Sequence, residues 1–187
     1  ADGRIVGLQA EFTEKALERM GCRPVWVELP WARALLELQA GRLDVLPGAL
    51  RRPERERYAQ WVEQHLVVPN RLYVRAGQRE RFGTATRLHE VLRPDLRLGV
   101  QIGVVYGADY AELLDDAAFR AQLTQLPVRT KLWQMLDLGR VDGVLAELGL
   151  AGCIVPTDVV LSDEAGGILF SRRSVDAATV QRYRDAS

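Results

Sequence analysis

The sequence has no surplus of either charge, because 25 lysine and arginine side chains balance 25 aspartate and glutamate side chains across 187 residues. Binding to nucleic-acid phosphates requires a basic surplus on one face, so the composition argues against a nucleic-acid partner. Long apolar runs are also missing, and no stretch approaches the roughly 20 residues that cross a bilayer. With 48% hydrophobic and 27% charged residues, the composition predicts an ordinary globular protein.

Cysteine and histidine are scarce, with two of each. Cys22 and Cys153 match no metal or redox spacing, and we expect each to be a small buried hydrophobic residue rather than half of a disulfide. His65 and His89 have no spacing typical of a metal site or a catalytic triad. A glycine-rich nucleotide-binding loop is absent as well. The sequence therefore predicts no metal and no cofactor.

Strand and helix signals alternate along the chain, which predicts an α/β fold with largely parallel sheets. In the first half, the predicted helices cover residues 12–20 and 31–40, and the predicted strands cover 25–29, 43–46 and 71–75. The run from 25 to 46 predicts a β-α-β unit. In the second half, the predicted strands cover 98–100, 126–128 and 141–145, and the predicted helices cover 106–114, 117–123 and 132–138.

The two halves contain one internal similarity. Residues 34–46 and 132–145 each run through an apolar helix, a Gly-Arg pair that ends it, and a strand with an early aspartate. The period of about a hundred residues is too long for a solenoid, whose repeats span about 20–50 residues. The pattern therefore predicts two similarly built lobes.

Five segments, taken in order, resemble the family 3 periplasmic solute-binding proteins that serve ABC importers. They are Asp2–Leu8, Trp31–Asp44 with Pro53–Tyr58, Leu98–Gly107, Gly139–Glu147 and Ile168–Ser171. The resemblance implies the two-lobed type 2 fold with a mixed sheet in each lobe. Lobe 1 is expected over residues 1–75, lobe 2 over 76–157, and the return to lobe 1 over 158–187.

The sequence departs from this family at both ends. The family's first strand is missing ahead of Asp2, and its final helices are cut short after Tyr183. Either the sequence is a fragment, or something else completes the lobe 1 sheet. We expect a monomer, with exchange of elements between copies as a hazard if lobe 1 lacks its first strand.

The resemblance assigns the two charged ligand contacts to different lobes. Arg55 stands where amino-acid-binding members grip the ligand's α-carboxylate, and a guanidinium presents two parallel donors that fit a carboxylate. Glu147 stands where the family places the carboxylate that holds an α-ammonium. For both residues the alternative is a solvated surface side chain.

The remaining expected contacts are backbone groups and aromatic rings. Gly48, Ala49 and Leu50 occupy the lobe 1 loop whose backbone usually meets the ligand. Gly103 and Val104 are expected to open a lobe 2 helix whose free N–H groups can bind an anion. Trp31 and Tyr106 are the aromatic residues expected near the cleft, with core packing as the alternative for both.

The function implied is capture of a small polar solute, such as an amino acid or a related carboxylate, between two lobes in the periplasm for delivery to an ABC permease. One alternative is the ligand-sensing extracellular domain of a membrane receptor. Another is an enzyme resembling cyclohexadienyl dehydratase, for which Glu147 would be the general acid. The leading expectation is a binding protein and not an enzyme.

Overall fold

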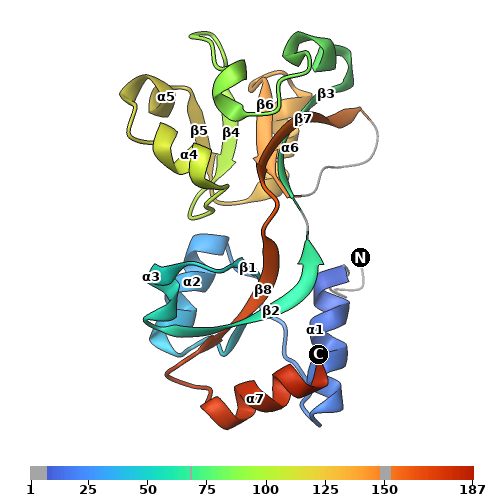
Figure 1. The fold of residues 1–187 in the computed structure, drawn as a ribbon, viewed down its shortest axis with the longest axis vertical. Helices are drawn as coiled ribbons and strands as arrows, with labels where there is room; N and C mark the ends of the chain where they lie inside the picture. Colours follow the sequence, from blue (N-terminus) through green and yellow to red (C-terminus); the bar gives the residue numbers. More distant parts are fainter. Residues whose placement is uncertain (1–7, 68, 148–152) are drawn as a thin grey trace. The chain divides into compact units, whose positions relative to one another are not determined.

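The computed structural model describes residues 8–67, 69–147 and 153–187 (Figure 1). They form two compact units: unit 1 holds residues up to 67 together with 165–187, and unit 2 holds the residues between them. The boundaries expected after residues 75 and 157 are therefore misplaced. The strands at 70–75 and 154–162 pair with each other, which puts both of them in unit 2.

Unit 1 is built on a three-stranded antiparallel sheet in which β8 pairs with β1 on one side and β2 on the other. Its elements are α1 (Leu8–Arg19), α2 (Trp31–Ala40), β1 (Val45–Leu50), α3 (Pro53–Glu56), β2 (Ala59–Val67), β8 (Ala165–Ser171) and α7 (Ala177–Ala186). The described strands of unit 1 are thus all antiparallel, whereas a mixed sheet was expected.

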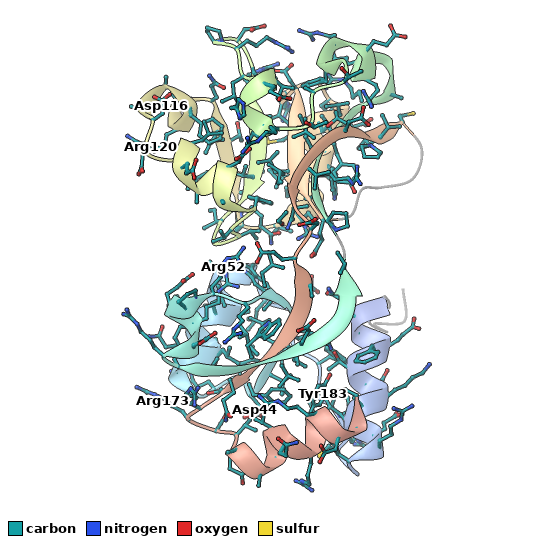
Figure 2. All side chains as sticks on the ribbon, in the orientation of Figure 1. Asp44, Arg52, Asp116, Arg120, Arg173 and Tyr183 are labelled. Atoms are coloured by element: carbon teal, nitrogen blue, oxygen red, sulfur yellow. The ribbon has the colours of Figure 1, made fainter. Side chains whose placement is uncertain are left out.

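Successive side chains of β8 point to opposite faces of the unit 1 sheet and pack in two different clusters. Ile168 and Phe170 pack with α1 and α7, while Leu169 packs on the opposite face with α2. Helices α1 and α7 lie side by side in Figure 1, and Tyr183 points from α7 towards the sheet in Figure 2. Its hydroxyl accepts a hydrogen bond from Gln64 Nε2 at 3.1 Å. Burial of each large apolar side chain of this sheet, such as Ile168, Leu169 or Phe170, contributes about 1.5–3 kcal/mol to the stability of the fold.

The strand predicted at 25–29, and with it the β-α-β unit, is absent. Residues 23–30 have no regular structure, and Val25 is 86% exposed. A strand exists only where a neighbour completes its ladder of hydrogen bonds, and β1 pairs only with β8 among the described residues. Residues 22–26 instead line a groove of about 410 Å³ with α1, the start of β1 and the beginning of α7.

Unit 2 is built on a mixed five-stranded sheet in the order β5-β4-β6-β3-β7. Its elements are β3 (Asn70–Arg75), η1 (Ala76–Phe82), η2 (Leu88–Val91), β4 (Leu98–Gln101), α4 (Ala108–Leu113), α5 (Ala117–Ala121), β5 (Leu123–Leu126), α6 (Arg129–Asp137), β6 (Gly143–Ala146) and β7 (Ile154–Ser162). Strands β4, β5 and β6 run parallel, and β3 runs antiparallel to β6 and β7.

Helices cover both faces of the unit 2 sheet. Leu145 of β6 packs in the same cluster as Phe119 of α5, while its neighbour Val144 packs with Leu132 and Leu136 of α6. This placement follows from the right-handed crossover rule, because the chain moves from β4 to one side to make β5 and then past β4 to the other side to make β6. Among the described residues, no helix is long and apolar enough to cross a membrane.

Both cysteines are free thiols, but their burial differs from the expectation. Cys22 is half-buried and Cys153 is exposed. Cys153 directly precedes β7, where its carbonyl accepts a hydrogen bond from Ala76 N. The prediction of a buried residue is therefore wrong for Cys153, whose backbone and not its side chain makes the structural contact.

Asp142 joins the start of β4 to the turn before β6. Its Oδ2 accepts hydrogen bonds from Arg97 N at 2.9 Å and Arg97 Nε at 3.3 Å. Burial opposes ionisation of Asp142, but these hydrogen bonds outweigh it and hold its pKa below the usual value. A depressed carboxyl pKa stabilises the fold above the unfolded pKa of about 3.9, and this contribution is lost as the pH falls through the folded value.

Asp142→Asn is accordingly expected to destabilise the protein at pH 7 by about 1.5–3 kcal/mol, the range for a hydrogen bond to a charged group. Urea unfolding of wild type and variant at several pH values measures this difference. It should shrink below pH 4, where the wild-type carboxylate also becomes protonated. A difference that stays constant from pH 7 to pH 3 would contradict the role given to the ionised carboxylate.

Candidate functional site: two ligand-contact regions

The first region is the last part of β1 in unit 1, where Gly48, Ala49 and Leu50 were expected to form a loop. The ladder to β8 is irregular between Pro47 and Ala49, and Gly48 has a positive φ of 77°. A Cβ at Gly48 would lie 2.5 Å from Gln9 Oε1, the end of a side chain that can move away, so it is the positive φ that favours glycine there. The irregularity of β1 thus coincides with a residue that has no Cβ.

The carbonyl groups at the end of β1 bind side chains of unit 1. Ala49 O accepts a hydrogen bond from Trp61 Nε1 at 3.1 Å, and Leu50 O accepts one from Arg55 Nη1 at 3.2 Å. Ala49 is fully buried and Leu50 is half-buried. These carbonyls thus bind the indole of Trp61 and the guanidinium of Arg55. The sequence had predicted that the backbone here would contact the ligand directly.

Arg55 is a charged residue of unit 1 whose side chain is buried. It lies on α3, whose first residue is Pro53, and only 5% of its surface is exposed. Its guanidinium carbon lies 5.8 Å from the centroid of the Trp31 ring at the start of α2, within the range of a cation–π interaction. The neighbouring Arg57, by contrast, is exposed.

No carboxylate lies within ion-pair distance of Arg55 among the residues that the structure describes. Burial is the main influence on its guanidinium and lowers its pKa, while Tyr58 and Glu54 act in the opposite direction. A buried cation without an anionic partner costs free energy, and arginine does not escape this cost by losing its proton. The site is therefore suited to an anion supplied from outside the chain.

The second region lies at the carboxyl ends of the parallel strands in unit 2. The chain leaves β4 towards β5 on one side, and β6 lies on the other side of β4. The strand order therefore reverses between β4 and β6, and open α/β sheets bind ligands just outside the carboxyl ends of strands at such a reversal. Gln101 ends β4, and Glu147 directly follows β6.

Three side chains meet at this edge. Arg129, the first residue of α6, donates from Nη1 to Glu147 Oε1 at 2.9 Å and from Nε to Gln101 Oε1 at 3.3 Å. The Arg129 and Glu147 side chains are 31% and 27% exposed, so both remain accessible to a ligand. We call Gln101, Arg129 and Glu147 the switch-point cluster.

The loop after β4 differs from the expected helix opening. Gly103 is exposed with a φ of 82°, and Val104 N donates to Gln101 O at 3.2 Å. The helix α4 begins only at Ala108. The expected N–H groups at Gly103 and Val104 are therefore not those of a helix start, because the chain first makes a turn that uses the Val104 N–H.

Tyr106 lies in the core of unit 2 with 1% of its surface exposed. Its hydroxyl accepts a hydrogen bond from Gln101 N at 2.7 Å, and its ring meets that of Tyr110 edge to face at 5.1 Å. Burial is the main influence on the Tyr106 phenol and raises its pKa, so the hydroxyl stays protonated at neutral pH. The hydroxyl thus binds the backbone of Gln101, the member of the switch-point cluster that ends β4.

Sequence reasoning missed two members of that cluster. Gln101 and Arg129 were not singled out, although each directly ends a strand or begins the helix after one. The rule that carboxyl ends of parallel strands meet at one edge is the signal that could have found them. Within the described ranges, no group of three or more histidine, cysteine, aspartate or glutamate residues could hold a metal ion.

Solved structures with the same fold are numerous. The arginine-bound form of a truncated ArgBP from T. maritima has a TM-score of 0.79 and 20% identity, and the match covers 99% of this chain and 85% of that one. An amino acid ABC transporter substrate-binding protein from Streptococcus pneumoniae bound to L-arginine has a TM-score of 0.80, 16% identity and coverages of 100% and 78%. A histidine kinase sensor domain with similarity to periplasmic binding proteins has a TM-score of 0.73, 18% identity and coverages of 99% and 80%.

These likenesses show the fold of the chain, the α/β type 2 periplasmic-binding-protein fold. A search of curated proteins finds no match. The model of one family, the bacterial extracellular solute-binding proteins of family 3, matches residues 1–149, which is most of the chain. The chain belongs to this family. Part of the matched opening, residues 2–7, lies outside the described residues.

Proposed function

We propose that this chain captures a small polar solute that carries a carboxylate group, such as an amino acid or a related acid, and delivers it to an ABC permease from the periplasm. The observation that carries the proposal is Arg55, a buried guanidinium that lacks an anionic partner among the described residues. The family supports a binding protein rather than an enzyme. The arginine-bound structures with the same fold support an amino acid or a similar molecule as the solute.

Each unit offers polar groups of its own to a ligand. In unit 1, Arg55 binds the carboxylate as a bidentate donor, and the ring of Trp31 packs beside it. In unit 2, the switch-point cluster presents the partly exposed side chains of Arg129 and Glu147.

A thermal-shift screen tests the proposal. A solute that binds only the folded chain stabilises it by about 2.7 kcal/mol at a hundredfold excess over its dissociation constant. We expect stabilisation by one or more amino acids or organic acids and none by the matched amides, in which the carboxylate is neutralised. Equal stabilisation by an acid and its amide would contradict a carboxylate-binding site, and so would a well-folded sample that no acid stabilises.

A second candidate role keeps the same ligand chemistry and changes the downstream partner. The likeness to a histidine kinase sensor domain favours it, with 99% of this chain covered. Reconstitution of the chain with its ABC permease in liposomes separates the two roles. Solute uptake that depends on the added chain supports import, whereas ligand binding without uptake supports a sensor.

A further inference from the structure

A small pocket lies at the start of β2 in unit 1, and Arg55 does not line it. Its volume is about 170 Å³. Three arginines line this pocket, and they come from parts of the chain that are far apart in the sequence. Arg51 directly follows β1, Arg172 directly follows β8, and Arg184 lies on α7. The fold of unit 1 therefore brings three cationic side chains to one cavity.

The charges of this pocket do not balance. Glu56 is the one carboxylate among the described residues that line it, and its Oε1 accepts a hydrogen bond from Arg51 Nε at 2.6 Å. Three cations and one anion leave the lining with two uncompensated positive charges. Like charges that share a cavity repel each other, so the pocket is suited to an anion that neutralises them.

Two of the arginines keep hydrogen-bond donors for a ligand. Arg172 is held by its backbone N–H, which donates to Tyr58 O at 2.9 Å, and by its Nε, which donates to Glu56 O at 3.0 Å. Its two Nη groups donate to no partner in the described part of the chain. Within the same ranges, Arg184 donates only from Nη1, to Gln181 Oε1 at 3.5 Å. A guanidinium has five N–H donors, so most of these donors have no protein acceptor.

The third arginine, Arg51, lies over an aromatic ring that is itself fixed. Its guanidinium carbon is 5.8 Å from the centroid of the Trp61 ring. Trp61 Nε1 donates to Ala49 O at 3.1 Å, and the ring lies so close to Gly167 that a Cβ there would overlap it. Together with the carboxylate of Glu56, the indole holds Arg51 at the wall of the pocket.

We infer that this pocket binds a small oxyanion with two negative charges, such as inorganic phosphate or the phosphate group of a monoester. A phosphate group of this kind carries a charge of about −1.5 to −2 at pH 7, which matches the two uncompensated guanidinium groups. The planar fork of a guanidinium binds phosphate through two parallel hydrogen bonds. A carboxylate, with a single charge, would neutralise only half of the excess. The inference is independent of the carboxylate contact proposed at Arg55, and its failure would leave that proposal standing.

NMR of the nitrogen-labelled chain tests the inference, with inorganic phosphate titrated in Tris chloride at constant ionic strength. The indole N–H signals separate two anion sites in unit 1, because Trp61 lines this pocket and Trp31 lies beside Arg55. We expect the Trp61 signal to shift and to saturate with phosphate and with sulfate, and to shift far less with acetate. A shift confined to the Trp31 signal would overturn the inference, and so would equal responses to phosphate and acetate or the absence of any response.

The variants Arg172→Gln and Arg184→Gln test the residues. Each should weaken phosphate binding by about two- to fivefold, the range for one exposed charge pair, and the double variant should no longer saturate. The matched control is Arg182→Gln, which removes an exposed arginine of the same helix, α7, that does not line the pocket. The control should keep the wild-type affinity. Equal affinities in the double variant and the control would contradict the site.

Glu56→Gln tests the charge balance in the opposite direction. It removes the carboxylate of the pocket and frees Arg51 Nε for the anion, so phosphate should bind about two- to fivefold more tightly than to the wild type. A purely structural role of Glu56 predicts no such gain. Unchanged or weaker binding in Glu56→Gln would contradict the inference, because the carboxylate would then not compete with the anion for the guanidinium groups.

Discussion

Replacing Arg55 by methionine is expected to weaken the binding of carboxylate solutes at least a hundredfold while leaving the ligand-free protein as stable as the wild type or more stable. Only 5% of the surface of Arg55 is exposed, and among the described residues its guanidinium donates to one backbone carbonyl, that of Leu50. Methionine keeps most of the volume and removes the buried charge. Replacing buried charges with apolar side chains is often neutral or stabilising by about 1–4 kcal/mol.

The size of the binding defect follows from the chemistry of the contact. Loss of a bidentate guanidinium–carboxylate contact removes two charge-assisted hydrogen bonds, each worth about 1.5–3 kcal/mol, so affinity should fall at least a hundredfold. Calorimetry with the tightest acid measures the affinity, and urea unfolding without ligand measures the stability. The matched control is Arg57→Met, close by in the chain and exposed. An Arg55→Met protein that is destabilised by several kcal/mol would show that Arg55 is structural.

Gly107→Ala is expected to cause a large loss of stability in unit 2 from a single added methyl group. Gly107 precedes α4 with a φ of 135°, a conformation that residues with a Cβ rarely adopt. Its Cβ would overlap the carbonyl oxygen of Leu161, a backbone atom of β7 that cannot rotate away as a side chain can. Backbone strain and overlap together should cost about 3 kcal/mol or more.

Chemical unfolding of the purified variant measures this cost, and Gly77→Ala is its matched control. A Cβ at Gly77 would meet no atom within 4 Å, and Gly77 has no positive φ, so its replacement should change stability by no more than about 1 kcal/mol. If both variants unfold at the same denaturant concentration, Gly107 does not lie against Leu161 of β7 in this way.

The helix α2 and its ending could be predicted because their signals are local. Apolar residues recur at helical spacing from Trp31, and the glycine that follows ends the helix in the left-handed conformation, with φ 76° at Gly41. Strands β3 and β4 likewise carry their own β-rich runs. Such elements are specified by a few neighbouring residues, so the sequence alone is sufficient to place them.

Other parts of the fold depend on partners that are distant in the sequence. The β-rich run at residues 25–29 has the composition of a strand, but among the described residues it has no neighbour to complete its hydrogen bonds. Strand β7 was not predicted, although its antiparallel pairing with β3 decides that both belong to unit 2. Local composition cannot supply either pairing, and so the domain boundaries were misplaced as well.

The candidate site likewise has features that local sequence predicts and features that depend on distant residues. Arg55 could be proposed from its place after Pro53, but its burial and its stacking on Trp31 appear only once α2 and α3 are placed. The pairing of Glu147 with Arg129 joins residues from two different elements of unit 2. No spacing rule links them, which is why the resemblance led to Glu147 without its guanidinium partner.

A crystal structure of the chain with the most strongly stabilising acid from the thermal-shift screen tests the central claim most directly. The account predicts the ligand carboxylate within hydrogen-bond distance of the Arg55 guanidinium, with both carboxylate oxygens accepting from it. A bound acid whose carboxylate is held elsewhere, with Arg55 still directed only at Leu50 O, would contradict it.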